Sequence, residues 1–103
     1  MSAMQRRKGR LGESTFARML QDRDWSVADL TSGKTSEDLL AIDPQGTSWA
    51  CEVKNTRNML AIHLAQAMEQ GRKRKAKWLL AQKIAGTSCW LVRRQGMQPV
   101  VWS

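Results

Sequence analysis

The residues of this chain best suited to chemistry are two carboxylates and one lysine near its middle. Asp38 precedes the segment Glu52-Val53-Lys54, in which Glu52 and Lys54 stand two positions apart. Because side chains alternate faces along a strand, Glu52 and Lys54 are expected to share one face. Carboxylates bind Mg²⁺, which can polarise a phosphate and activate a bound water, and an ammonium group beside them can orient that water. These residue types therefore predict metal-assisted phosphodiester hydrolysis.

A hairpin between these residues would bring the two carboxylates together. Pro44-Gln45-Gly46 is a turn sequence, and a three-residue loop with its glycine in the left-handed conformation makes Asp43 and Thr47 the closing pair. Counting back from that pair puts Asp38 opposite Glu52, where the Cβ atoms of opposed residues lie about 4.5–5.5 Å apart. The register thus predicts that the two acids can reach one cation.

The elements that position these residues follow from hydrophobic periodicity and turn residues. The expected elements, in order, are a helix over 11–23, strands over 25–30, 37–43 and 47–55, a long helical region over 59–85, and strands over 88–94 and 97–102. Gly86 is expected to stop the long helix, and Gln95-Gly96 to turn the last hairpin. The order αβββαββ indicates an α/β or α+β fold with a central mixed sheet flanked by helices.

Length and composition restrict the class of protein. At 103 residues the chain is expected to form a single domain over 1–103, with residues 1–8 as a flexible basic tail. No apolar run reaches the length of a membrane span and the start lacks a signal-peptide pattern, so a cytoplasmic protein is expected. Cys51 and Cys89 are interpreted as reduced residues inside strands, since two thiols and one histidine do not make a structural zinc site.

The charge of the chain favours a polyanionic partner. Lys and Arg number 17 against 9 Asp and Glu, a formal net charge of +8, and the basic residues are clustered. Such clusters suit nucleic acid, whose binding is strengthened by counterion release. The residues expected to contact DNA are Arg6, Arg7, Lys8, Arg10, Lys34, Arg57, Arg72, Lys73, Arg74, Lys75 and Lys77.

The spacing of these motifs resembles a known group of nucleases. Asp38, then Glu52-Val53-Lys54, with Glu13 in a preceding helix, resembles the PD-(D/E)XK superfamily. Together with Gly9-Arg10-Leu11-Gly12-Glu13, Trp25-Ser26-Val27 and Ser32-Gly33, this layout is similar to archaeal-type Holliday-junction resolvases and phage-encoded relatives. The resemblance covers about residues 9–94.

The resemblance implies a restriction-endonuclease-like fold, a homodimer and an Mg²⁺-dependent endodeoxyribonuclease, with Mn²⁺ able to substitute, that resolves branched DNA in recombination and repair. The site residues that it implies are Glu13, Ser32, Asp38, Glu52 and Lys54 in catalysis, and Asp38, Glu52, Val53 and Glu13 at the metal. The sequence departs from the family where Glu37 replaces the proline. Glu37 or Asp43 is therefore an alternative metal ligand. However, side chains alternate along a strand, which places both on the face opposite Glu52.

Other interpretations of these residues stay open. A nuclease of the same superfamily could act on nicks, flaps, ends or duplex sites, and a catalytically silent DNA-binding protein could keep the fold. His63 is expected to face solvent or a phosphate rather than act as a general base. Gln66 and Gln70 are candidates for a helical glutamine near the site, and the tryptophans are expected mainly in the core.

Overall fold

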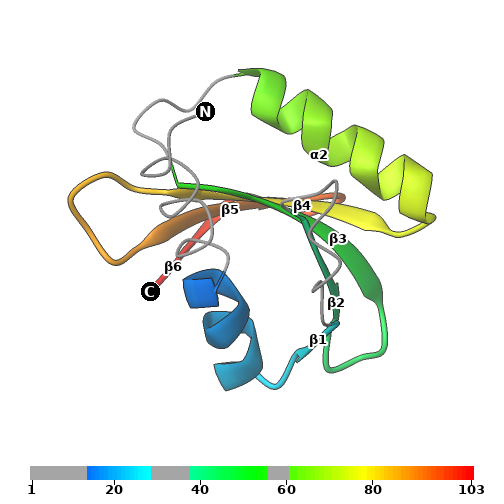
Figure 1. Ribbon diagram of the computed structural model, residues 1–103, viewed down its shortest axis with the longest axis horizontal. Coiled ribbons are helices and arrows are strands. Elements are labelled where there is room, and N and C mark those ends of the chain that lie inside the picture. Colours follow the sequence, from blue (N-terminus) through cyan, green and yellow to red (C-terminus); the bar gives the residue numbers. More distant parts are fainter. Residues whose placement is uncertain (1–13, 29–37, 56–60) are drawn as a thin grey trace.

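The computed structural model describes residues 14–28, 38–55 and 61–103, which form a six-stranded mixed sheet with a helix on each face (Figure 1). The elements are a helical segment over 14–22, β1 (Ser26–Val27), β2 (Asp38–Ile42), β3 (Ser48–Lys54), α2 (Ala61–Arg74), β4 (Lys77–Lys83), β5 (Trp90–Arg94) and β6 (Val100–Trp102). The strands lie in the sheet in chain order. The expected α+β arrangement around a central mixed sheet is confirmed.

The parallel pair β3 and β4 lies at the centre of the sheet, and every other neighbouring pair is antiparallel. Parallel strands need a crossover connection, and α2 supplies it by passing over one face of the sheet (Figure 1). The buried residues of α2 are His63, Ala67 and Gly71, spaced four apart along one side of the helix. Two of these three are small, so the helix axis can approach the sheet closely.

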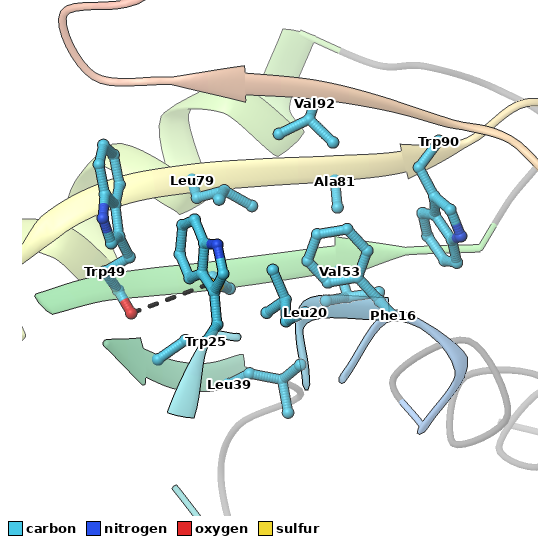
Figure 2. Close-up of a cluster of buried hydrophobic side chains, with 12 residues drawn as sticks. Phe16, Leu20, Trp25, Leu39, Trp49, Val53, Leu79, Ala81, Trp90 and Val92 are labelled. Carbon is cyan, nitrogen blue, oxygen red and sulfur yellow. Dashed lines mark hydrogen bonds between the residues drawn. The ribbon is translucent and has the colours of Figure 1, made fainter. Parts of the chain in front are cut away.

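The hydrophobic core fills the opposite face, beneath the helical segment 14–22 (Figure 2). β3 contributes Trp49, Cys51 and Val53 to this face, as its alternation predicts. Phe16 and Leu20 reach the same cluster from the helical segment and are fully buried. Complete burial of such a side chain stabilises the fold by about 1.5–3 kcal/mol. This face therefore anchors β3 and leaves its other face available for polar residues.

The prediction of a long helical region over 59–85 is wrong for the second half of that range. The helix α2 ends at Arg74, Lys75 adopts a positive φ of 53°, and β4 follows. In β4, Leu79 faces the core while Leu80 is buried on the other face. A strand buried on both faces is a continuous apolar run, which periodicity cannot distinguish from a buried helix. The described residues therefore contain one more strand than expected.

Several boundaries also differ from the expected ones. Gly86 does not stop a helix but lies between β4 and β5 with a φ of 76°. The last hairpin turns at Gly96, where φ is 75°, as expected, although its strands are shorter than predicted. Cys51 is buried in β3, and Cys89 is half-buried just before β5 rather than inside it; the two thiols are not joined. The basic tail expected over 1–8 lies outside the described residues.

The tryptophans pack largely as expected. Trp25, Trp49 and Trp90 belong to the core, and Trp102 lies at its edge, half-buried. The Trp102 ring stacks on Phe16 with centroids 6.3 Å apart. Across the described ranges, no helix is both long and apolar enough to cross a membrane.

Candidate active site

The register of the candidate site is set by the β2–β3 turn. Asp43 N donates to Thr47 O at 2.9 Å, and Gly46 has a φ of 89°, so the turn is the predicted three-residue loop. The Asp43 carboxylate accepts hydrogen bonds from the backbone N–H groups of Gln45 and Thr47, both at 2.9 Å, and from Trp49 Nε1 at 3.0 Å. Both Asp43 oxygens are thus engaged in holding the turn.

These hydrogen bonds also explain the acidity of Asp43. Burial alone would raise the pKa of its carboxyl, but the bonds from Trp49, Thr47, Gln45 and Gly46 together outweigh burial and lower the pKa below its ordinary value. An ionised Asp43 is a better acceptor for the three donors, because hydrogen bonds to a charged acceptor are stronger than neutral ones. The residue therefore serves the hairpin, which in turn fixes the positions of the acids farther along both strands.

The resulting register pairs Asp38 with Glu52. This is the pairing expected from the turn, and every Cα partner between the two strands follows from it, down to Ile42 opposite Ser48. The backbone position of Asp38 is therefore established, whereas its side chain lies outside what the structure describes. Glu13, Ser32, Lys34, Glu37, Arg57 and Arg6 to Arg10 also fall outside the described ranges.

Glu52 and Lys54 lie side by side on the face of β3 that α2 covers. Lys54 Nζ is 3.1 Å from Glu52 Oε1, and Glu52 is only 6% exposed. A buried carboxylate is costly unless a charge or a set of hydrogen bonds compensates it, and the ammonium group of Lys54 does so here. Val53, between them, turns its side chain into the core, so any contact of this residue with a metal would go through its backbone carbonyl.

His63 lies on the same side of the sheet, and the expectation that it faces solvent is wrong. It is 7% exposed and points from the first turn of α2 toward β4, where its Nδ1 is 3.3 Å from Gln82 Nε2. Burial lowers the pKa of His63, the positive charge of Lys54 lowers it further, and Glu52 opposes both. The ring is therefore neutral at pH 7, with Nδ1 able to accept from the Gln82 amide.

Gln82 is a residue of this region that sequence reasoning missed. It is 3% exposed, and its Cα partner in the parallel β3–β4 register is Lys54. The signal that would have revealed it is the spacing within β4, where Leu80 and Gln82 share the face turned to α2. The helical region expected over 59–85 conceals this signal, because it includes residues 77–83. Gln66 is exposed and Gln70 half-buried on α2, outside the line of buried residues that faces the sheet.

Basic residues cluster at the end of α2 and directly after it. Arg72, Lys73 and Arg74 occupy its last turn, with Lys75 and Lys77 directly after it. Arg72 is paired with Glu69, its Nε lying 3.0 Å from Glu69 Oε2, which reduces its availability to a ligand. Lys77 instead shares the core face of β4 with Leu79, and its Nζ lies 5.6 Å from the centroid of the Trp49 ring.

The described side chains fit a divalent cation in chemistry but supply only part of a ligand set. Within 14–28, 38–55 and 61–103, no cluster of three His, Cys, Asp or Glu side chains is placed to hold a metal ion. Glu52 offers a buried carboxylate, and Gln82 Oε1 is a buried oxygen with no hydrogen-bond partner in that part of the chain. Oxygen donors of this kind suit Mg²⁺ and Mn²⁺, with Asp38 at the opposing register position.

The fold is similar to that of a solved archaeal protein. It matches Hjc, a Holliday junction resolvase from the archaeal hyperthermophile Archaeoglobus fulgidus, with a TM-score of 0.56 and 18% sequence identity, over 84% of this chain and 83% of that one. This likeness shows the fold, which is restriction-endonuclease-like as the resemblance implied. No protein-family model matches the chain, and no curated protein sequence matches it either.

Proposed function

We propose that this protein is a divalent-metal-dependent endodeoxyribonuclease that acts on branched DNA. The observation that carries the proposal is the pairing of Asp38 with Glu52 across the β2–β3 hairpin, with Lys54 Nζ 3.1 Å from Glu52 on the same face. The fold shared with a Holliday junction resolvase supports it. Cytoplasmic location, a homodimer and a role in recombination or repair belong to the same proposal.

Each residue has a distinct role in this proposal. Asp38 and Glu52 would hold Mg²⁺ or Mn²⁺, with Glu13 and the Val53 carbonyl as further ligands. The cation would polarise the scissile phosphate and lower the pKa of a bound water. Lys54, held beside Glu52, would orient the attacking water and offset negative charge that develops on the phosphate. Ser32 would contact the scissile phosphate.

Basic residues would position the DNA without reading its sequence. Lys73 and Lys75, at the end of α2, carry charge on the side of the sheet that α2 covers, and Lys77 follows at the start of β4. Contacts with phosphates fix the orientation of a duplex but carry no direct sequence information, so selectivity would come from the shape of the DNA. A branched substrate offers such a shape to two protomers, each cutting one strand.

The test is cleavage of a four-way junction beside a linear duplex of the same sequence, with Mg²⁺, with Mn²⁺ and with a chelator. The proposal predicts metal-dependent cuts in the junction and little or none in the duplex. If the protein cuts both DNAs equally, or prefers nicks, flaps or ends, the four-way junction is not its specific substrate. The protein would still be a nuclease. Binding without cleavage of any of these DNAs in either metal would favour a silent DNA-binding protein.

A further inference from the structure

On the α2 face of the sheet, a buried hydrogen-bond acceptor has no donor among the described residues. Gln82 Oε1 has no hydrogen-bond partner in the described part of the chain, although the residue is 3% exposed. Trp90 Nε1 and Arg94 Nε share this property, but the β4–β5 register puts both of these residues on the core face. Buried polar groups in folded proteins nearly always have a partner, in the protein or in an ordered water.

The position of Gln82 ties this acceptor to the candidate site. Gln82 and Lys54 are Cα partners on adjacent parallel strands, which lie about 4.8 Å apart. Their side chains share the face turned to α2, since Val53 and Ala81 point into the core. Gln82, which carries the unpartnered oxygen, therefore lies beside Lys54 on the strand next to the carboxylate–lysine pair.

The contact with His63 determines which atom of the Gln82 amide lacks a hydrogen-bond partner. Its Nδ1 accepts from Gln82 Nε2 at 3.3 Å, and the neutral ring can accept only at a nitrogen without a hydrogen. With the amide nitrogen engaged by His63, the oxygen remains as the free end. A pair that served only to attach α2 to the sheet would not need an acceptor buried without a partner.

We propose that Gln82 Oε1 accepts a hydrogen bond from a water molecule at the Glu52–Lys54 site, and that His63 fixes the amide in the orientation that this requires. Gln82 is then a residue that positions water for the reaction, and His63 acts through Gln82. The inference rests on the proposed function, since the water that it places is the one that a nuclease would activate. It adds β4 and the first turn of α2 to a site otherwise built from β2 and β3.

Paired substitutions separate positioning from a merely structural role. Gln82→Met keeps a similar unbranched volume and removes the amide, and we expect kcat to fall about 10- to 100-fold with KM little changed, as for other groups behind a metal site. His63→Leu should give a similar loss. His63→Asn, whose amide oxygen can accept from Gln82 Nε2, should restore most of kcat. Gln21→Met, at an exposed position of the helical segment on the opposite face of the sheet, is the matched control and should leave kcat unchanged.

Two results of this series would overturn the inference. The first is a Gln82→Met enzyme with wild-type kcat. The second is equal loss in His63→Leu and His63→Asn together with an equal fall in melting temperature, because a structural link would respond to both substitutions through stability alone.

A readout without catalysis keeps this inference separate from the proposed function. A high-resolution crystal structure of the wild-type protein with Ca²⁺ should show an ordered water within hydrogen-bond distance of Gln82 Oε1. If that water is present but the protein cleaves no DNA, the binding of a water by Gln82 stands and the proposed function fails. If the protein cleaves DNA but Gln82 Oε1 is bonded to a protein group instead, the inference fails and the proposed function stands.

Discussion

Three polar residues on the α2 side of the sheet, Glu52, His63 and Gln82, are buried and contact a polar partner, which for Glu52 is the half-buried Lys54. Glu52 is compensated by Lys54, and His63 is bonded to Gln82, all within one face of β3 and β4. These contacts offset the cost of burying polar groups, and Gln82 Oε1 is the atom of this set that they leave without a partner in the described residues. The neutral state of His63 is part of this arrangement, since a proton on Nδ1 would remove the acceptor that holds Gln82.

The stability of the protein should therefore depend on pH through His63. Its pKa is lowered in the folded state from 6.5, first by burial and then by Lys54. Below 6.5 the unfolded chain takes up a proton that the folded chain refuses, so this contribution is full above 6.5 and is lost as pH falls toward the folded pKa. We expect the urea midpoint of the wild type to fall between about pH 7.5 and pH 5.5, and His63→Asn to fall less. An equal fall in both proteins would contradict this.

At the scale of elements, the β2–β3 turn should be sensitive to the chemistry of one carboxylate. In Asp43→Asn, an amide nitrogen would face a donor, either Trp49 Nε1 or the backbone N–H groups of Gln45 and Thr47. Loss of a hydrogen bond to a charged acceptor costs about 1.5–3 kcal/mol, so we expect the free energy of unfolding to fall by roughly that amount. Urea denaturation near neutral pH measures it. A variant as stable as the wild type would show that the carboxylate does not hold the turn.

The connection from α2 to β4 should require glycine at position 71, where the helix packs against the residues that follow it. A Cβ on Gly71 would lie 3.0 Å from both Ala76 O and Trp78 Cβ, and 3.2 Å from Trp78 N. Alanine normally stabilises a helix by up to about 1 kcal/mol over glycine, but two of these neighbours are backbone atoms that cannot move without the turn. We expect Gly71→Ala to lower the free energy of unfolding by about 1–2 kcal/mol, as overpacking does. Gln66→Ala, at an exposed position of the same helix, is the control, and a stabilised Gly71→Ala would contradict the packing described.

The elements also show what the sequence could and could not predict. The β2–β3 register followed from local turn chemistry, because a three-residue loop closed by Asp43 and Thr47 leaves one way to count along both strands. β4 could not be found in the same way, since its apolar run is buried on both faces and continues from a helix. The β4 side of the site, Gln82 with its partner His63, depends on that crossover and was missed with it.

At the scale of the whole molecule, the net charge of +8 should dominate DNA affinity. The logarithm of the binding constant should fall linearly with the logarithm of the salt concentration, by a slope of about 0.9 per phosphate contacted. Lys73→Ala, in the last turn of α2, should reduce that slope by about 1. Arg18→Ala is the matched control, because Arg18 is exposed on the helical segment that covers the opposite face. Equal changes in the two variants would contradict DNA binding on the α2 side.

The most direct test of the central claim asks whether acids on neighbouring strands serve one cation. Cleavage of a four-way junction is measured against Mg²⁺ concentration for the wild type, Asp38→Asn, Glu52→Gln and Glu69→Gln, the last an acid paired with Arg72 on the surface of α2. We expect both strand variants to lose cleavage by at least about 100-fold, with junction affinity in Ca²⁺ retained, while Glu69→Gln cleaves as the wild type does. Full activity in either Asp38→Asn or Glu52→Gln would contradict the shared-cation site.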